Sequence, residues 1–164
     1  MPSFDLVSKL DAMELQNALL TTEKTILGRF DFKGSEAKAE YKEKDKLIEI
    51  RAEDETKVKA VRDILMTNMG KRGLGLKGLE ESPIEPTGMK MKKMTIKVVS
   101  GIDKEKAKII NKLLKENGSK VKSQYMDEKF RLESKNIDDL QAAFALLKNS
   151  KELNIDLQME NMKR

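Results

Sequence analysis

The chain has 164 residues and a net charge of +5, a length that suffices for one ordinary domain or two small ones. Charged residues make up 37% and aromatic residues only 4%, so we expect thin cores of aliphatic side chains and methionine. The absence of cysteine and histidine excludes disulfides and thiol chemistry, and it removes the usual zinc ligands and the commonest general base.

The chain begins, over residues 1–10, without the basic start and apolar run of a signal peptide. No stretch approaches the roughly 20 apolar residues of a membrane-spanning helix. Because the lack of cysteine fits a reducing compartment, we expect a cytoplasmic protein with no membrane partner. No residue pattern calls for a cofactor, and none is expected.

The first half predicts the order strand, helix, strand, strand, helix. A short strand around Phe4 leads to a helix capped by Asp11. Two runs of alternating apolar residues, 37–41 and 48–52, predict a hairpin with a charged turn. Apolar residues at helical spacing over 58–65 predict a second helix.

The second half predicts the same order and closes with a further strand. Its elements are a strand over 94–98, a helix capped by Asp103, a hairpin turning at Asp127-Glu128, a helix capped by Asn136 and a strand over 155–159. The repeated order predicts an α+β protein, a tandem duplication of ferredoxin-like (RNP-like) two-layer sandwiches with antiparallel sheets.

The expected domain boundaries follow from this repeat. We place the first ferredoxin-like domain at residues 1–82, a linker rich in proline at 83–90, and the second domain at 91–164. The first strand could pair with either sheet, because a short strand is weakly specified by its pattern alone.

The basic residues concentrate in the second half. Residues 1–82 carry 15 Lys and Arg against 16 Asp and Glu, a net −1, whereas residues 83–164 carry 18 against 12, a net +6. Strand parity directs six cations of this half away from the helices: Lys93, Lys97, Lys120, Lys122, Lys129 and Arg131. We expect this open sheet face to bind an anion, chiefly through Lys93, Lys97, Lys122 and Arg131. The alternative is an ordinary solvated strand surface.

Base stacking on that face is not expected. RNA-recognition modules stack bases on exposed aromatic residues of their central strands. The one aromatic residue in the central strands here, Phe130, has the parity that points inward. The cations of this face still allow it to contact phosphate groups.

Two further segments could meet phosphate. In Arg29-Phe30-Asp31-Phe32-Lys33-Gly34-Ser35, a clamp would use Arg29 and Lys33 for phosphate and Gly34 for close backbone approach. The alternative is a structural connection in which Arg29 pairs with Asp31 or Asp5 and both phenylalanines anchor the segment to a core. The glycine-rich loop over 70–78 contains Lys71 and Arg72, and it could bind phosphate or simply end a helix.

The Arg29–Ser35 segment and Pro2-Ser3-Phe4-Asp5 at the start resemble the YajQ family of small bacterial nucleotide-binding proteins. Lys71-Arg72-Gly73, Ser100-Gly101-Ile102 and Asp138-Asp139-Leu140-Gln141 also fit its pattern, in order. The resemblance implies two ferredoxin-like domains, no established catalysis and nucleotide binding. Some members are considered cyclic di-GMP receptors that act through other macromolecules, and RNA binding has been suggested for the family.

The favoured hypothesis is a non-enzymatic nucleotide-binding protein whose ligand is cyclic di-GMP or another guanine nucleotide, with GTP and ATP as further candidates. The alternative is an RNA-binding protein that contacts the phosphates of tRNA or rRNA. A third hypothesis is a small-molecule-sensing pair of regulatory domains with a protein partner. An enzyme is not expected, because no nucleophile-base pair and no metal-ligand cluster is apparent.

Overall fold

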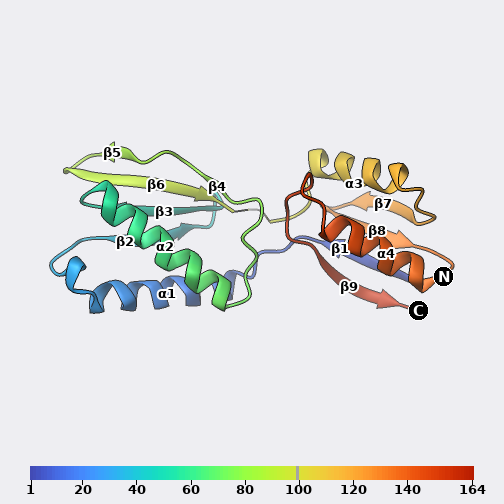
Figure 1. Ribbon diagram of the computed structural model, residues 1–164, viewed down its shortest axis with the longest axis horizontal. Coiled ribbons are helices and arrows are strands. Elements are labelled where there is room, and N and C mark those ends of the chain that lie inside the picture. The colour runs from blue at the N-terminus through green and yellow to red at the C-terminus, as the bar shows by residue number, and fades with distance from the viewer. Residues whose placement is uncertain (99) are drawn as a thin grey trace. The chain divides into compact units, whose positions relative to one another are not determined.

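The computed structural model describes residues 1–98 and 100–164 (Figure 1). In these residues it contains four α-helices, one 3-10 turn and two antiparallel sheets. The predicted fold class, two α+β sandwiches in tandem, is therefore confirmed.

The helices and most of the strands lie close to where the sequence pattern predicts them, but the last strand spans 158–163 and not 155–159. The helices are α1 (Ala12–Gly28), α2 (Glu55–Lys71), α3 (Lys104–Glu116) and α4 (Ile137–Lys148), with the 3-10 turn η1 at Phe30–Phe32. The strands are β1 (Ser3–Val7), β2 (Lys38–Lys42), β3 (Leu47–Ala52), β4 (Glu80–Glu81), β5 (Glu85–Thr87), β6 (Met91–Lys97), β7 (Lys122–Met126), β8 (Lys129–Glu133) and β9 (Gln158–Lys163).

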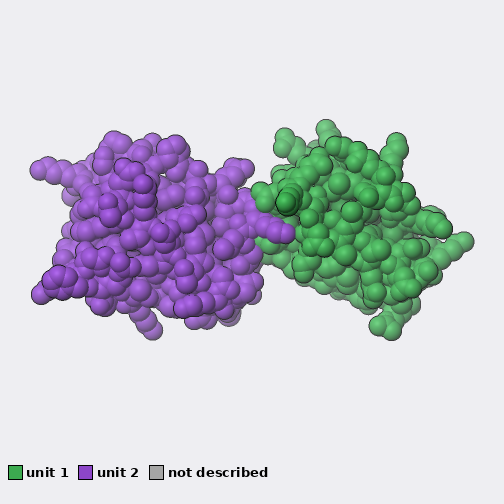
Figure 2. Space-filling model, in the orientation of Figure 1, with its two compact units in different colours: residues 1–9, 99–164 green, residues 10–98 purple. Residues whose placement is uncertain are grey.

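The chain divides into two compact units, coloured separately in Figure 2. Unit 1 consists of Met1–Lys9 and Val99–Arg164, and unit 2 of Leu10–Val98. The sheet of unit 1 has the strand order β7-β8-β1-β9. The sheet of unit 2 has the order β2-β3-β6-β4, and β5 also pairs with β6.

The sequence predicted domain boundaries at residues 82 and 91, and the two compact units are divided differently. The reason is that the two halves of the chain exchange a central strand, β1 for β6. β1 pairs on one side with β8 and on the other with β9, so it belongs to the sheet built by the second half. β6 pairs with β3 in the sheet of the first half. Residues 83–90 are not a linker between units, since they contain β5, where Glu85 lies opposite Lys93.

Apolar alternation does not explain the exchange, because β1 and β6 share it. Charge pairing between strands explains little of it. Lys97 lies opposite Glu80, but Lys93 lies opposite Glu85 on one side and Arg51 on the other. Asp5 of β1 lies opposite Arg131 of β8 and also opposite Glu160 of β9. Opposite charges on facing strand positions stabilise a pairing and like charges destabilise it, so these contributions partly cancel.

Each unit has its own core, on the side of the sheet that its two helices cover (Figure 1). In unit 1 the buried residues include Phe4 and Leu6 of β1 and Phe130 and Leu132 of β8. In unit 2 the corresponding central-strand residues are Ile48, Ile50, Met94 and Ile96. The opposite face of each sheet carries the intervening, mostly polar side chains.

The helix ends follow the predicted capping. Asp11 accepts a hydrogen bond from the N–H of Glu14, and Asp103 accepts one from that of Lys106. Asn136 caps α4 in the same way, through the N–H of Asp138. These side chains satisfy backbone donors that a helix start leaves unpaired.

Candidate functional site

The nine cations and glycines predicted to meet a ligand fall into four separate places. Three of them, Arg29, Lys33 and Gly34, follow the end of α1, and Lys71 and Arg72 lie at the end of α2. Lys93 and Lys97 lie on β6 in unit 2, whereas Lys122 and Arg131 lie in unit 1. The expectation that all four strand residues share one basic face is wrong, and the strand exchange is the reason.

The open sheet face of unit 1 contains a shallow hollow of about 210 Å³. We call it the Arg131 hollow; it is lined by Asp5, Gln124, Met126, Asp127, Lys129 and Arg131. These residues come from β1, from the facing strands β7 and β8, and from the turn between them. Lys122 lies at the other end of β7, opposite Glu133, and does not line it.

The turn beside the hollow has an unusual backbone. Asp127 and Glu128 both have a positive φ, at 53° and 62°. Two successive residues with positive φ characterise the type I′ turn, whose twist matches that of the strands it joins. The turn predicted at this position is confirmed, and it brings the Asp127 carboxylate to the hollow's edge.

The Arg131 guanidinium is anchored by a hydrogen bond to the buried carboxylate of Asp5. Its Nε donates to Oδ1 of Asp5 at 3.3 Å, and Nδ2 of Asn161 donates to Oδ2 of the same group at 2.8 Å. Asp5 is only 8% exposed. The hydrogen bond from Asn161 lowers the pKa of Asp5, against the opposing effect of burial, and Arg131 lowers it further. The carboxylate is therefore ionised at neutral pH.

The remainder of the Arg131 guanidinium is available to a ligand. Its side chain is 51% exposed, and in the described part of the chain only its Nε is engaged. A guanidinium carries five N–H donors in a fixed fork, so four remain. Because one edge is anchored and the other is open, the guanidinium suits a phosphate or a carboxylate, either of which can accept two parallel hydrogen bonds.

The open sheet face of unit 2, like the Arg131 hollow, mixes cations with carboxylates. Lys42 Nζ lies 3.1 Å from Oε2 of Glu40, which also pairs with Lys38, and Arg51 pairs with Glu49. Hydrogen bonds from Lys38 and Lys42 lower the pKa of Glu40. Because carboxylates intervene between its cations, this face attracts an anion less than the predicted basic surface would.

The segment after α1 is a folded turn. The Arg29 guanidinium makes two hydrogen bonds to Asp31, of 2.9 and 2.8 Å, and lies 5.5 Å from the centre of the Phe32 ring. The hydrogen bond from Arg29 lowers the pKa of Asp31. The pairing of Arg29 with Asp31, one of the two alternatives weighed from the sequence, is therefore what the structure contains.

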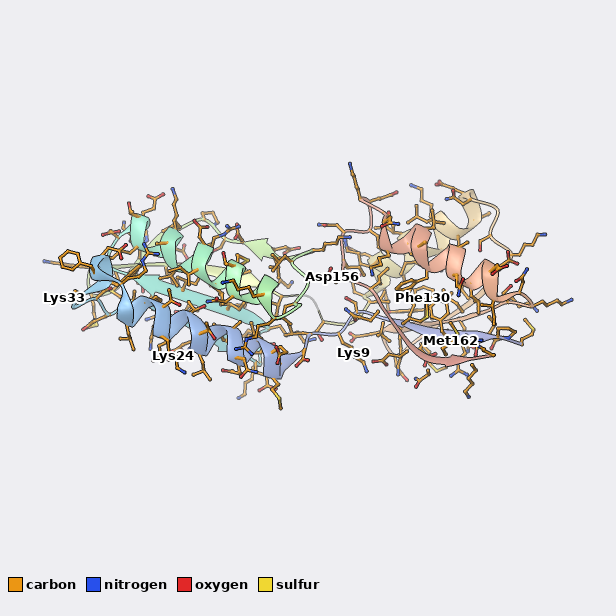
Figure 3. The ribbon with its side chains drawn as sticks, turned by 60° about the horizontal axis from the view of Figure 1, so that its bottom comes forward. Lys9, Lys24, Lys33, Phe130, Asp156 and Met162 are labelled. Atoms are coloured by element: carbon orange, nitrogen blue, oxygen red, sulfur yellow. The ribbon has the colours of Figure 1, made fainter. Side chains whose placement is uncertain are left out.

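The two phenylalanines of this turn have opposite roles. Phe32 is 4% exposed and packs in the core of unit 2, whereas Phe30 is 90% exposed. The expectation that both rings anchor the segment is thus wrong for Phe30, because a 3-10 turn replaces the extended backbone that would align them. Lys33 follows at the tip of the turn (Figure 3), and Gly34 has a φ of +75°.

Another hollow, of about 460 Å³, is lined by residues of α1 and α2 and by the residue after α2: Glu14, Thr21, Asn68, Lys71 and Arg72. Arg72 is held loosely here: its Nη1 lies 3.8 Å from Oε2 of Glu14, and its Nη2 donates to Thr21 Oγ1 at 3.5 Å. The hollow lies at the carboxyl end of α2, where the helix dipole disfavours an anion. The positive charges of Lys71 and Arg72 offset the unfavourable effect of the helix dipole and the negative charge of Glu14.

Sequence reasoning identified Arg131 but missed most of its surroundings. Gln124 and Met126 follow from the parity of β7 once the register with β8 is known. Asp5 could not be placed, because its strand was grouped with residues 1–82 and could pair with either sheet, whereas it pairs with β8 and β9. Among the described residues, no group of three or more acidic side chains is arranged to hold a metal ion. No helix of this part of the chain is long and apolar enough to cross a bilayer.

Comparison with known proteins gives a consistent result. A family model described as "Nucleotide-binding protein YajQ-like" matches residues 2–163. A nucleotide-binding protein of Geotalea daltonii is 43% identical over 164 residues, which cover 100% of both chains. Similar proteins of the same description occur in Cytophaga hutchinsonii, 42% identical over 99% of this chain and 100% of the relative, and in Myxococcus xanthus, 40% identical over 99% of each.

Proposed function

Since the chain belongs to the YajQ-like family of nucleotide-binding proteins, we propose that it binds a guanine nucleotide, with cyclic di-GMP as the leading candidate, and catalyses no reaction. We place the ligand in the Arg131 hollow, on the open sheet face of unit 1. The observation that carries the proposal is the half-exposed Arg131 guanidinium, anchored at one edge by buried Asp5.

The residues of the hollow suit the phosphate and the base of a guanine nucleotide. Lys129 and Arg131 supply positive charge for a phosphate. Met126, 57% exposed, supplies an apolar surface for the face of a base. The Asp127 carboxylate can accept hydrogen bonds from the N1–H and N2–H₂ donors of guanine, whereas the same edge of adenine presents an acceptor at N1. This arrangement favours guanine over adenine.

A calorimetric titration tests the proposal. Cyclic di-GMP, GTP and ATP are titrated into the wild-type protein and into the Lys129→Ala and Arg131→Ala variants. A lost charge-assisted hydrogen bond of about 1.5–3 kcal/mol weakens binding roughly 10- to 150-fold. Lys129→Ala is the cleaner variant, because Arg131→Ala also removes a partner of Asp5.

The matched control is Lys97→Ala, on the open face of the other sheet. It removes a strand lysine of the same kind and should leave the affinity unchanged. If Lys97→Ala weakens binding and the two variants in the hollow do not, the ligand lies elsewhere. Tighter binding of ATP than of either guanine nucleotide would contradict the base assignment.

A separate observation favours RNA as a second candidate ligand. Phe30 is 90% exposed, and Lys33, for which no ion pair is found among the described residues, follows three positions later in the same segment. Exposed rings flanked by cations stack the bases of single strands. Titration of tRNA at several salt concentrations, with Phe30→Ala as the variant, tests this: RNA binding should weaken steeply with salt and lose affinity in the variant. Salt-independent binding, or an unaffected variant, would argue against it.

A further inference from the structure

Helix α1 carries a row of large apolar side chains that the core of unit 2 does not use. Met13 is 74% exposed, Leu20 54% and Leu27 79%. They are spaced by seven residues, which places them about 10.5 Å apart along the helix axis. We call these three residues the α1 stripe.

The stripe lies on the solvent side of the helix. Side chains seven residues apart are separated by about 700° around the helix axis, which is about 20° short of two full turns. The three side chains therefore fall within an arc of about 40°. The buried face of the same helix consists of Leu15, Ala18, Leu19, Thr22 and Ile26. From these positions, the centre of the stripe lies about 140° around the axis from the centre of the buried face. Folding of unit 2 therefore gives no reason for apolar residues here.

An exposed row at a seven-residue spacing occupies one of the two apolar positions of the heptad by which paired helices stay in contact along their length. We propose that the α1 stripe pairs with the α1 stripe of a second copy of the chain, antiparallel and centred on Leu20. In this register Leu20 meets Leu20 of the second copy, and Met13 meets its Leu27. All six apolar side chains are then covered.

The polar residues that flank the stripe determine the relative orientation of the two helices. Those within about 60° of Leu20 around the axis are Gln16, Asn17, Glu23 and Lys24. Figure 3 marks Lys24 on α1. A parallel pair would set Glu23 against Glu23 and Lys24 against Lys24, and facing like charges are destabilising. The antiparallel pair sets Lys24 opposite Gln16 and Glu23 opposite Asn17. Asn17 already donates one amide N–H to Glu14 at 3.1 Å, and its second is free for Glu23.

The expected dimer is weak. Three apolar side chains from each copy cover less surface than the roughly 1,200–2,000 Å² of a standard interface. An interface below the standard size is typical of weak, transient contacts. The self-association should therefore depend on the protein concentration.

Sedimentation equilibrium of the full chain from about 1 to about 300 µM provides the test, since a weak dimer dissociates as the protein is diluted. The apparent mass should rise from that of a monomer towards that of a dimer. Leu20→Lys, which sets two ammonium groups against each other at the centre, should abolish the rise. Leu76→Lys, at another exposed leucine of unit 2, should leave it unchanged. A chain that stays monomeric throughout, or a dimer that Leu20→Lys does not affect, would overturn the proposal.

The absence of cysteine allows a direct test of orientation. Met13→Cys and Leu27→Cys proteins, one of them carrying a size tag, are treated with a short bismaleimide above the dissociation constant. The antiparallel pair predicts a crosslinked heterodimer when the two are mixed and little crosslinking of either alone. Efficient crosslinking of Met13→Cys to itself, without the heterodimer, would refute this orientation.

Discussion

Removing residues 1–9 is expected to unfold unit 1 and to leave unit 2 folded. The reason is that β1 is a central strand of the unit 1 sheet, paired with β8 on one side and β9 on the other. Without it, β9 loses its only strand partner in the described structure. Unit 2 is continuous in sequence from Leu10 to Val98 and contains its own central strand, β6.

The size of the effect follows from burial. Phe4, Leu6 and Val7 of β1 are 0–2% exposed. Full burial of such a side chain contributes about 1.5–3 kcal/mol, so the three together contribute about 5–9 kcal/mol. A domain's total stability is about 5–15 kcal/mol. The loss of β1 therefore removes most or all of the stability of unit 1.

Four fragments distinguish this account from the division at residues 82 and 91. Circular dichroism and thermal melting should find residues 10–98 cooperatively folded, and both 1–82 and 91–164 unfolded, because each of the latter lacks its sheet's central strand. As a control, residues 1–9 joined to 100–164 by a Gly-Ser linker should fold. Cooperative melting of 1–82 and 91–164, with failure of the linked control, would refute the strand exchange.

Two further predictions concern single residues. Phe32→Ala should destabilise unit 2 by about 3–5 kcal/mol in urea denaturation, since its ring is buried. Phe30→Ala should change the free energy of unfolding by less than about 0.5 kcal/mol, since its ring is exposed. Equal effects of the two changes would contradict the 3-10 turn that buries one ring and exposes the other. Hydrogen bonds from Asn161 and Arg131 lower the pKa of Asp5 in the folded protein. Its stabilising contribution is therefore present above its unfolded pKa, about 4, and is lost as the pH falls below that value. Asp5→Asn should therefore lose less stability between about pH 5 and pH 2 than the wild type, and an unchanged acid limb would count against the Arg131–Asp5–Asn161 network.

The local structure was largely predictable from the sequence, since it depends on near neighbours. The caps at Asp11, Asp103 and Asn136 and the turn at Asp127-Glu128 are encoded within a few residues of where they occur. The strand exchange was not, because β1 and β6 share the same alternation and differ only in their strand partners. Those of β1 lie more than 120 residues away in β8 and β9, and the β3 partners of β6 lie 40–50 residues away. Periodicity fixes which face of a strand is buried but not which sheet receives it.

The candidate site shows the same limit. The parity of β8 correctly directs Arg131 outward, away from Phe130 and Leu132. Its anchor Asp5 lies 126 residues away and enters only through the placement of β1. The contrast between Phe30 and Phe32 depends on a single 3-10 turn, for which a stretch with two aromatic residues and alternating polarity gives no signal.

The most direct test of the account is an NMR titration of the isotope-labelled chain with cyclic di-GMP. If the guanine nucleotide binds in the Arg131 hollow, backbone amide signals of Asp5 and of residues 124–131 should shift in a saturable manner, whereas the open sheet face of unit 2 should not respond. Saturable shifts confined to unit 2, or none with cyclic di-GMP or GTP at saturating concentration, would contradict the placement of the nucleotide site.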